Sequence, residues 1–209
     1  FITRHISIYL LGGVFVLGNF FKYICYYFLC IVVVTIFVIF TFLQVNLATE
    51  DYPYGIIDSS DYVWPLPDHS YISSYFGYRN SPTAGASSYH SGIDIPAPEG
   101  TKIYSICDGI VTFASWGAGG GYTIVVENNG IKVSYCHVSP NFFVYRNQEV
   151  KKGEFISNVG PKNVYGIENN PYHDSFGNPT NGATTGCHLH LAIKVNNKSA
   201  DPLSFVTPP

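Results

Sequence analysis

The first 48 residues of this 209-residue chain contain no acidic side chain, and their only Lys and Arg residues are Arg4 and Lys22. All 14 Asp and Glu lie from Glu50 onward with the other nine Lys and Arg, so this part carries a formal charge of −5. Binding to nucleic acid requires a basic footprint that attracts phosphates, and the chain has none. We therefore expect no nucleic-acid partner, and one domain of about 150 residues after the apolar start.

Charge is also missing from residues 23–43, which form an uninterrupted and largely apolar run. At about 1.5 Å per residue, a helix of this length spans roughly 30 Å, the thickness of the hydrocarbon core of a bilayer. The alternatives are a buried helix of a soluble protein and a cleaved signal peptide. The apolar part of a signal peptide is normally about 7–15 residues long and ends at small residues, whereas 46–48 (NLA) is a poor cleavage site. We predict an uncleaved transmembrane anchor over residues 23–45.

The charges on either side of the apolar run predict its orientation. Arg4 and Lys22 precede it, and Glu50 and Asp51 follow it. Because positive charge stays on the cytoplasmic side, we expect a single-pass protein of the cell membrane whose C-terminal part lies on the extracellular, cell-wall side. Residues 1–22 then form an N-terminal cytoplasmic or apolar segment. The role of Ile6–Phe21, which is only marginally long enough to span a membrane, stays open.

The remaining chain lacks any window with the sustained apolar period of a capped helix. Residues 46–62 are polar and acidic and read as a linker, whereas 63–206 consist of short β-rich runs separated by Gly, Asn and Pro. The expected strands are Ile103–Ile106, Ile110–Ser115, Tyr122–Glu127, Ile131–Cys136 and His188–Val195. The Asn128-Asn129-Gly130 segment predicts a hairpin, because a positive φ is cheap at Asn and Gly. The fold class is therefore all-β, an antiparallel sheet or barrel-like domain preceded by a transmembrane helix.

Cysteine is sparse in the domain, and its spacing matches no CxxC zinc motif. Cys107, Cys136 and Cys187 cannot all pair with one another. We expect small buried hydrophobic side chains, while a disulfide between two of the three stays open in an extracellular protein.

One long segment, 161–183, has five Asn, two Pro beyond its first residue and little periodicity. Loops of this length in compact domains are usually functional or disordered. Because the segment runs directly into the histidine-rich strand, we expect it to form one wall of a binding groove.

Histidine pairs with strand-like spacing occur in the run CHLHLAIKV. Residues i and i+2 of a strand face the same side, so His188 and His190 should point together while Leu189 and Leu191 point into the core. Such a pair suits one metal ion, or one metal ligand plus one acid–base group. A pair of exposed strand histidines without function is the plain alternative.

Two further histidines lie in short motifs upstream. His90 precedes Asp94 by four residues in a segment that Gly92 and Pro96 keep from being helical. An extended and kinked segment could bring the imidazole and the carboxylate together as zinc ligands, although a surface loop would explain them equally well. His137 follows an apolar-alternating strand, and the pattern does not fix the direction of its side chain.

In this order the motifs H-x3-D, Y-x-H and H-x-H resemble the lysostaphin-type (β-lytic) zinc metalloendopeptidases, which hydrolyse peptidoglycan. Other segments support the resemblance. Ile72–Arg79 resembles the opening S-x-F-G-x-R of that family, and His90–Thr101 resembles its metal loop. Asp108–Val111 resembles its D-G-x-V strand entry, Thr185–His190 its final strand, and Asp201-Pro202 the end of its domain. The resemblance covers about residues 64–205.

Carried over residue by residue, the resemblance implies that His90, Asp94 and His190 are the protein ligands of a Zn²⁺ ion. The fourth position is then left to water, as in catalytic rather than structural zinc sites. The resemblance assigns His137 and His188 to general base catalysis and transition-state stabilisation. An imidazole beside the metal can take a proton from water and pass one to the leaving amine.

The chain departs from the family pattern at a few positions. Leu191 stands where an aromatic residue is usual, and the 161–183 loop is longer than typical, which leaves the substrate preference open. Cys136 and Cys187 lie beside the histidines, where a soft thiolate could compete for the metal. Strand alternation predicts that both cysteines face away from it.

The sequence thus predicts a membrane-anchored zinc metalloendopeptidase that hydrolyses peptide cross-bridges of bacterial peptidoglycan. Its expected partners are the peptidoglycan peptide and the membrane. The alternatives are a non-catalytic wall-binding or amidase-activating module of the same fold, and a domain whose zinc is purely structural.

Overall fold

The computed structural model describes residues 22–41, 59–82 and 86–209. The chain divides into two compact units, Phe1–Pro53 and Tyr54–Pro209, which are considered separately. Ile6–Phe21 and most of the expected linker 46–62 lie outside the described residues. Their assignments stay predictions.

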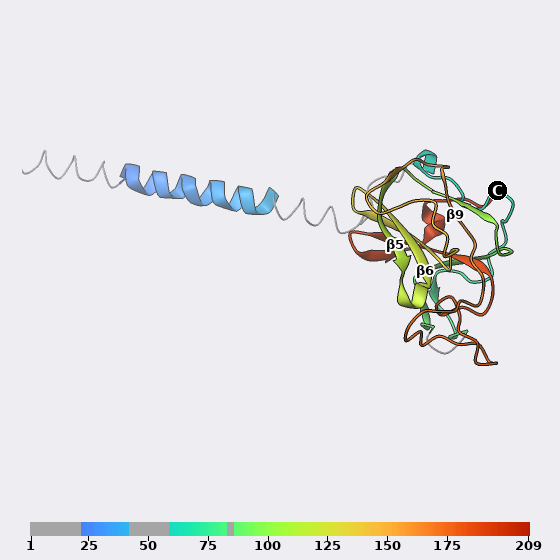
Figure 1. Ribbon diagram of the computed structural model, residues 1–209. Helices are drawn as coiled ribbons and strands as arrows, with labels where there is room; N and C mark the ends of the chain where they lie inside the picture. Colours follow the sequence, from blue (N-terminus) through green and yellow to red (C-terminus); the bar gives the residue numbers. More distant parts are fainter. Residues whose placement is uncertain (1–21, 42–58, 83–85) are drawn as a thin grey trace, which may run out of the picture. The chain divides into compact units, whose positions relative to one another are not determined.

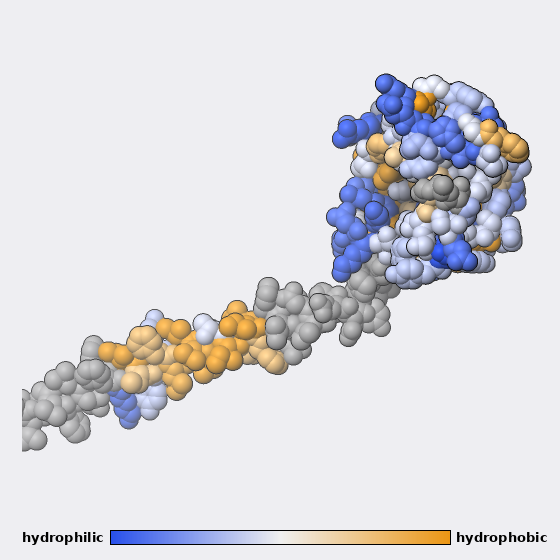
Figure 2. All heavy atoms as spheres, turned by 90° about the horizontal axis from the view of Figure 1, so that it is seen from below, coloured by the Kyte–Doolittle hydropathy of each residue, from blue (hydrophilic) through white to orange (hydrophobic). Residues whose placement is uncertain are grey.

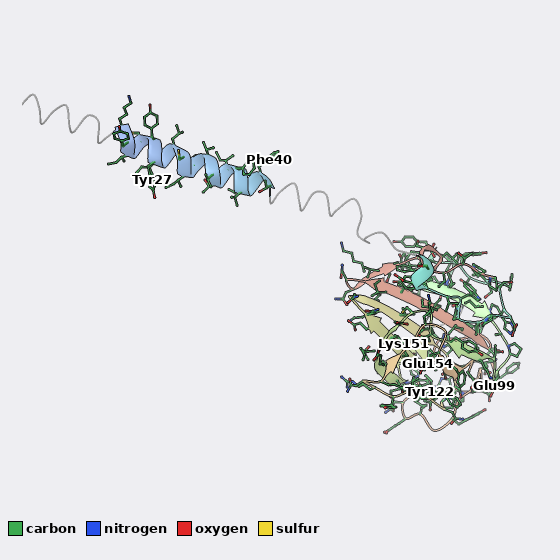
Figure 3. All side chains as sticks on the ribbon, turned by 90° about the horizontal axis from the view of Figure 1, so that it is seen from above. Tyr27, Phe40, Glu99, Tyr122, Lys151 and Glu154 are labelled. Carbon is green, nitrogen blue, oxygen red and sulfur yellow. The ribbon has the colours of Figure 1, made fainter. Side chains whose placement is uncertain are left out.

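The first unit contains a helix, Lys22–Thr41, within the apolar run. Its side chains, such as those of Tyr27 and Phe40, project from different sides of the axis and are exposed (Figure 3). The surface of the helix is largely apolar (Figure 2). A helix that is apolar all round needs either a protein core or a membrane around it. With 20 residues it is long enough to cross a bilayer.

The second unit is built on antiparallel strands, and Figure 1 shows the long strands β5 and β6 side by side. The main sheet has the order β11-β10-β7-β6-β5-β8, with β3 also paired to β10. Two small pairs, β1-β2 and β4-β9, accompany it. The strands are β1 Gly77–Tyr78, β2 Tyr89–His90, β3 Gly92–Pro96, β4 Lys102–Tyr104, β5 Gly109–Trp116, β6 Tyr122–Asn128, β7 Ile131–Cys136, β8 Glu149–Val150, β9 Phe155–Asn158, β10 His188–Val195 and β11 Lys198–Ala200. Three short 3₁₀ helices complete the unit: η1 Ser59–Asp61, η2 Ala118–Gly120 and η3 Pro202–Ser204.

This architecture confirms the all-β prediction and the helix before it. The sheet path ends at β11 and β8, and among the described strands no pairing joins these two ends. The fold is therefore an open sheet rather than a closed barrel. All five expected strands are present within one or two residues of their expected ends.

Two hairpin turns set the register of the central strands. Between β6 and β7, Asn129 and Gly130 have φ of 48° and 79°, which confirms the expected hairpin. Between β10 and β11, Asn196 and Asn197 have φ of 49° and 66°. Two-residue hairpin turns favour positive φ because it matches the twist of the strands, and Asn and Gly tolerate it.

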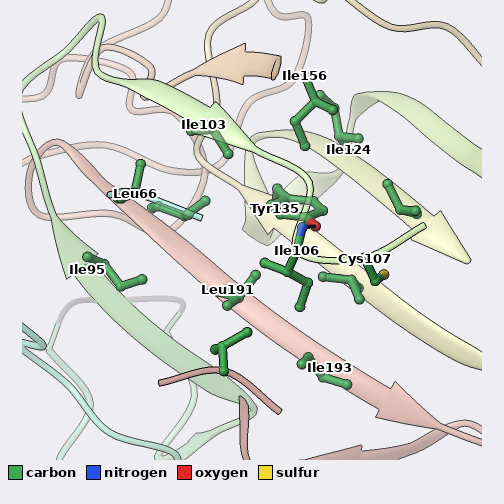
Figure 4. Close-up of a cluster of buried hydrophobic side chains, with 14 of the residues drawn as sticks. Leu66, Ile95, Ile103, Ile106, Cys107, Ile124, Tyr135, Ile156, Leu191 and Ile193 are labelled. Carbon is green, nitrogen blue, oxygen red and sulfur yellow. Dashed lines mark hydrogen bonds between the residues drawn. The ribbon is translucent and has the colours of Figure 1, made fainter. Parts of the chain in front are cut away.

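The hydrophobic core lies under the face of β10 that carries Leu189 and Leu191, both with no exposed surface. Figure 4 shows Leu191 and Ile193 of β10 among side chains from the neighbouring strands, including Ile95 and Tyr135. The buried Tyr135 hydroxyl accepts a hydrogen bond of 2.7 Å from a backbone N–H, so its polar atom is satisfied. Alternation then sends His188 and His190, the residues before and after Leu189, to the opposite face of the sheet.

Candidate active site

Strand pairing brings one carboxylate and two imidazoles to a single point. β3 and β10 are antiparallel, and their register places Asp94 directly opposite His190. β2 delivers His90, whose Nε2 lies 3.1 Å from Asp94 Oδ1 and 2.9 Å from His190 Nδ1. The His190 Nδ1 atom is 2.8 Å from the same carboxylate oxygen. The structure therefore brings together the three residues that the sequence predicts as metal ligands.

These three atoms fit a zinc ion. A zinc with four tetrahedral ligands at roughly 2.0–2.1 Å separates its ligand atoms by about 3.3 Å, close to the spacing seen here. His90 Nδ1 donates to the Tyr75 carbonyl at 2.8 Å, so His90 Nε2 presents a lone pair to the Asp94 carboxylate and to His190. The lone pair of His90 Nε2 and the carboxylate oxygen thus face each other, and a cation between them would stabilise this arrangement. Two imidazole nitrogens and one carboxylate oxygen are ordinary zinc ligands.

Arg79 holds the other oxygen of the carboxylate. Arg79 Nη1 lies 2.9 Å from Asp94 Oδ2 and also contacts Ser74 Oγ. The Asp94 N–H donates to the Ser74 carbonyl at 2.9 Å, which fixes the backbone of β3 beside the arginine. The Asp94 Oδ1 atom therefore faces the histidines. An orienting contact of this kind commonly fixes a metal ligand.

The charge of Asp94 is strongly stabilised. Burial alone would raise its pKa, but the contacts with the rings of His188, His190 and His90 outweigh burial and hold the pKa well below its usual value. The carboxylate is therefore ionised at any pH near neutrality, as a metal ligand must be.

The two other predicted histidines flank this point. His188 Nε2 lies 3.4 Å from Asp94 Oδ1, and the centroids of the His137 and His188 rings are 4.7 Å apart. Each ring donates its Nδ1–H to a backbone carbonyl, His188 to Gly186 at 2.9 Å and His137 to Asn181 at 2.6 Å. These bonds fix the tautomer and leave Nε2 of both rings as the nitrogen with a free lone pair.

His137 has an unusual backbone. It follows the last residue of β7 and has a φ of 59°, in the left-handed region that few residues with a side chain adopt. Its N–H donates to the Gly120 carbonyl at 2.7 Å, and its carbonyl accepts from the Gly160 N–H at 2.9 Å. Strand alternation ends at this residue, which is why the sequence pattern does not fix its direction. Backbone strain held in place by surrounding contacts is common at functional sites.

Two of the imidazoles, those of His137 and His190, have pKa values that favour the neutral form. Burial, together with the neighbouring His188 and His190, lowers the pKa of His137 to about 3. Burial also lowers the pKa of His190, against the opposing effect of Asp94. At neutral pH His137 is therefore an uncharged imidazole that can accept a proton, and His190 can offer its lone pair to a metal.

The expectation that Cys136 faces away from the site is wrong. The register pairs Cys136 with His190, so both side chains lie on the same face, and Cys136 lines the groove described below. Burial raises the pKa of its thiol to about 11, so it stays protonated and is a poor competitor for metal. Cys187 instead packs against the core, as expected, and both residues are free thiols, as is the buried Cys107.

A groove of about 680 Å³ opens over this face of the sheet and contains all five predicted site residues. Most of the 161–183 loop does not line it, and Ala183 is the member of that loop that does so. The loop is organised instead by Asp174, which pairs with Lys162 at 3.1 Å and accepts the N–H groups of Phe176 and Asn178. Its contribution to the site is the Asn181 carbonyl bonded to His137.

A model of Peptidase family M23 matches residues 88–202, more than half of the chain and the whole region that supplies the five site residues. The chain belongs to peptidase family M23. M23 enzymes are zinc-dependent metallopeptidases, so the resemblance to lysostaphin-type endopeptidases is confirmed at the level of the family.

Relatives of this M23 domain are found among both sequences and structures. The DD-carboxypeptidase/endopeptidase Mpg of Neisseria meningitidis is 32% identical over 138 residues, which is 66% of this chain and 27% of Mpg. A zinc containing peptidase from Vibrio cholerae has a TM-score of 0.53 at 28% identity, covering 69% of this chain and 40% of that one. The catalytic domain of lysostaphin from Staphylococcus simulans has a TM-score of 0.52 at 25% identity, covering 67% and 93%. The chain thus spans about a quarter of the length of Mpg.

Two residues of the M23 site are missing from the sequence-based set of five. Arg79 lies in the opening motif Ile72–Arg79, which the family resemblance includes without giving any residue a role. Asn181 has no exposed surface, and its side chain accepts from the Tyr122 N–H at 2.8 Å and donates to the Val138 carbonyl at 3.0 Å. No motif marks Asn181, since its partners are backbone groups far away in the sequence.

Proposed function

We propose that this protein is a membrane-anchored zinc metalloendopeptidase that hydrolyses peptide cross-bridges of bacterial peptidoglycan. The observation that carries the proposal is the convergence of His90 Nε2, Asp94 Oδ1 and His190 Nδ1 beside two further imidazoles with free Nε2 atoms. In this proposal the first three residues hold the zinc ion. His137 and His188 act as general base and stabilise the transition state.

The chemistry follows from the protonation states of these residues. A zinc ion held by these three residues would lower the pKa of a water molecule toward 7 and polarise the scissile carbonyl group. His137 Nε2 can accept the proton of the attacking water because its Nδ1–H is committed to Asn181 and its low pKa keeps the ring neutral. His188 Nε2 can hold a proton near the same point and donate a hydrogen bond to developing negative charge.

Membrane anchoring is part of the proposal. The described helix Lys22–Thr41 is apolar and exposed, and we assign residues 23–45 to a single transmembrane anchor, 1–22 to the cytoplasmic end and 46–62 to a linker. Residues 63–206 then form the peptidase domain. Acidic residues after the helix and basic residues before it support placing that domain on the cell-wall side of the membrane.

The substrate assignment draws on the relatives. Mpg is described as a DD-carboxypeptidase/endopeptidase, and a relative from Vibrio cholerae that is 28% identical over 143 residues as the peptidoglycan DD-endopeptidase ShyC. An anchored domain that faces the cell wall meets peptidoglycan as its nearest peptide polymer. We therefore assign peptidoglycan peptides as the substrate class.

The test uses the full chain purified in detergent. Zinc content is measured alongside the release of new amino termini from purified peptidoglycan, and mass spectrometry of the fragments identifies the bond. We expect one zinc per chain and hydrolysis that stops on chelation while the β-sheet circular dichroism signal is retained. A chain that holds stoichiometric zinc yet releases no amino termini would instead be a non-catalytic wall-binding or amidase-activating module. Unfolding on chelation would indicate a structural zinc.

A further inference from the structure

The groove carries positive charge in a domain that is close to neutral. Residues 63–206 contain 10 Asp and Glu and nine Lys and Arg, a formal charge of −1. Of these carboxylates, Asp94 is the one that lines the groove among the residues described, and this side chain is shared by Arg79 and the histidines. The remaining formal charge along the groove is Lys194. A cleft whose unpaired charge is of one sign concentrates ligands of the opposite charge.

Lys194 lies on the same strand face as the proposed metal ligand His190. Strand alternation places His188, His190, Ala192 and Lys194 of β10 on one side of the sheet, and all four line the groove. Four residues of a strand separate Lys194 from His190, which is about 13 Å along the groove. The Lys194 side chain is exposed, so its ammonium group is accessible to a substrate lying over β10.

The charge of Lys194 is not neutralised by its neighbours. The register places Lys132 of β7 directly opposite, and like charges in this arrangement repel. Lys132 has a partner, Glu127, at 3.6 Å. Within the described part of the chain no carboxylate lies within ion-pair distance of Lys194. A lysine kept beside another lysine without a counterion costs stability, and an anion from outside the chain would offset that cost.

We propose that Lys194 binds a carboxylate of the substrate peptide, at a subsite about 13 Å from the metal position, and thereby selects acidic peptides. This subsite rests on the proposed function, since it belongs to the same groove. An extended peptide rises about 3.4 Å per residue, and a lysine side chain reaches several ångström, so the carboxylate belongs to a residue two to four positions from the scissile bond.

The experiment pairs a variant with a change in the substrate. Purified peptidoglycan is used either native or with its free carboxylates converted to amides, which leaves phosphate groups unchanged. Hydrolysis of both by the full chain in detergent is compared with that by Lys194→Met. We expect the variant to raise the apparent KM for native peptidoglycan by roughly 3- to 10-fold, as for one charged contact in a partly open groove, with kcat little changed.

Amidation of the substrate should produce the same loss with the wild-type chain and no further loss with Lys194→Met, because both changes remove the same contact. Lys198→Met is the matched control. It lies on the same hairpin and carries the same charge, but its register partner Val195 faces the core side of the sheet. This control should hydrolyse both substrates at the wild-type rate.

Several outcomes would overturn the subsite. One is equal hydrolysis of native and amidated peptidoglycan by the wild-type chain, which needs no variant to observe. Another is a Lys194→Met defect that persists on amidated substrate, which would indicate a different anion such as phosphate.

Co-sedimentation of zinc-free protein with the two forms of peptidoglycan separates this proposal from the proposed function. Binding that requires both Lys194 and free carboxylates, without hydrolysis by the zinc-loaded chain, would refute the enzyme and keep the subsite. Normal hydrolysis that does not depend on Lys194 would support the enzyme and refute the subsite.

Discussion

Asp94 and His190 are fixed by the register of two paired strands, whereas His137 is fixed by loops that meet at the end of a third strand. On the strand side, β3 and β10 share five register pairs, and one of these pairs is the Asp94–His190 couple. On the loop side, His137 has a positive φ and depends on the carbonyl of Asn181 to hold its ring. The proposed zinc ligands and the proposed general base are thus built by different means.

Because the two groups of residues are held by different contacts, metal binding and catalytic rate should respond to different substitutions. Register is supported by a whole ladder of backbone hydrogen bonds and by the buried leucines of β10, so the metal position is robust to single changes outside the ligands. The orientation of His137 depends on a few hydrogen bonds from a long loop. Substitutions on the strand side should therefore affect metal binding, and those on the loop side should affect the rate.

The largest effect is expected from the strand side. Asp94→Ala or His190→Ala removes a ligand, and we expect loss of both bound zinc and hydrolysis to background. Metal analysis and amino-terminus release measure the two losses, with circular dichroism to confirm that the sheet is retained. Asp68→Ala, at an exposed position outside the groove, is the charge-matched control. Stoichiometric zinc in either ligand variant would contradict the assignment.

The next effect comes from the acid–base pair. His137→Ala and His188→Ala should keep most of the zinc and lower kcat by about 10²- to 10⁴-fold, as for removal of a general acid–base group. Kinetics on zinc-loaded protein of verified metal content checks this expectation. Near-normal turnover in either variant would overturn its role, and loss of zinc from His188→Ala would move this residue to the ligand set.

The same contrast explains what the sequence could predict. Alternation over CHLHLAIKV places two histidines on one face and two leucines in the core, and the structure has both arrangements. The hairpin at Asn129-Gly130 also follows from local preference alone. Strands and two-residue turns are local patterns, so one sequence suffices to find them.

Features that depend on tertiary contacts cannot be predicted from the sequence alone. β3 was expected only as an extended and kinked segment, because its partner β10 lies almost 100 residues away. The facing of Cys136 was predicted wrongly because it was inferred without the register between β7 and β10. The 161–183 loop was expected to line the groove, yet its buried Asn181 holds the backbone at the end of β7 instead. Each of these contacts ends on a backbone carbonyl, which leaves no residue-type signal.

Smaller effects are expected from Arg79, which contacts the proposed zinc ligand Asp94, and from Asn181, which holds His137. Arg79→Met removes the contact to Asp94 Oδ2, and we expect zinc affinity to fall by about 10- to 100-fold, a typical effect of losing such a support. Asn181→Ala should leave zinc affinity nearly unchanged and lower kcat by roughly 10-fold, because it loosens the loop that holds His137. Zinc titration measures the change in affinity, and kinetics on zinc-loaded protein measures the change in kcat.

Asn141→Ala, at an exposed position, is the control for the asparagine variant. If Asn181→Ala lost zinc and Arg79→Met lost only rate, the proposed division between the two sides would be wrong.

The smallest effect is a pH dependence of stability in the zinc-free protein. The pKa of His137 is about 3 in the folded chain and 6.5 in an unfolded one, so between these values the unfolded state binds a proton that the folded state does not. Stability should therefore be full above pH 6.5 and fall progressively as the pH is lowered toward 3. His190 contributes in the same direction, because its pKa is also lowered.

Below about pH 5, Asp94 and Asp174 add to this loss, since the ionised form of each is favoured in the folded state. The window from about pH 6.5 to 5 therefore isolates the histidines. In that window, thermal melting of His137→Gln should depend on pH less steeply than that of the wild-type chain. An unchanged slope would show that His137 is solvated and protonates freely, and the loop side would then not hold it as tightly as the strands hold His190.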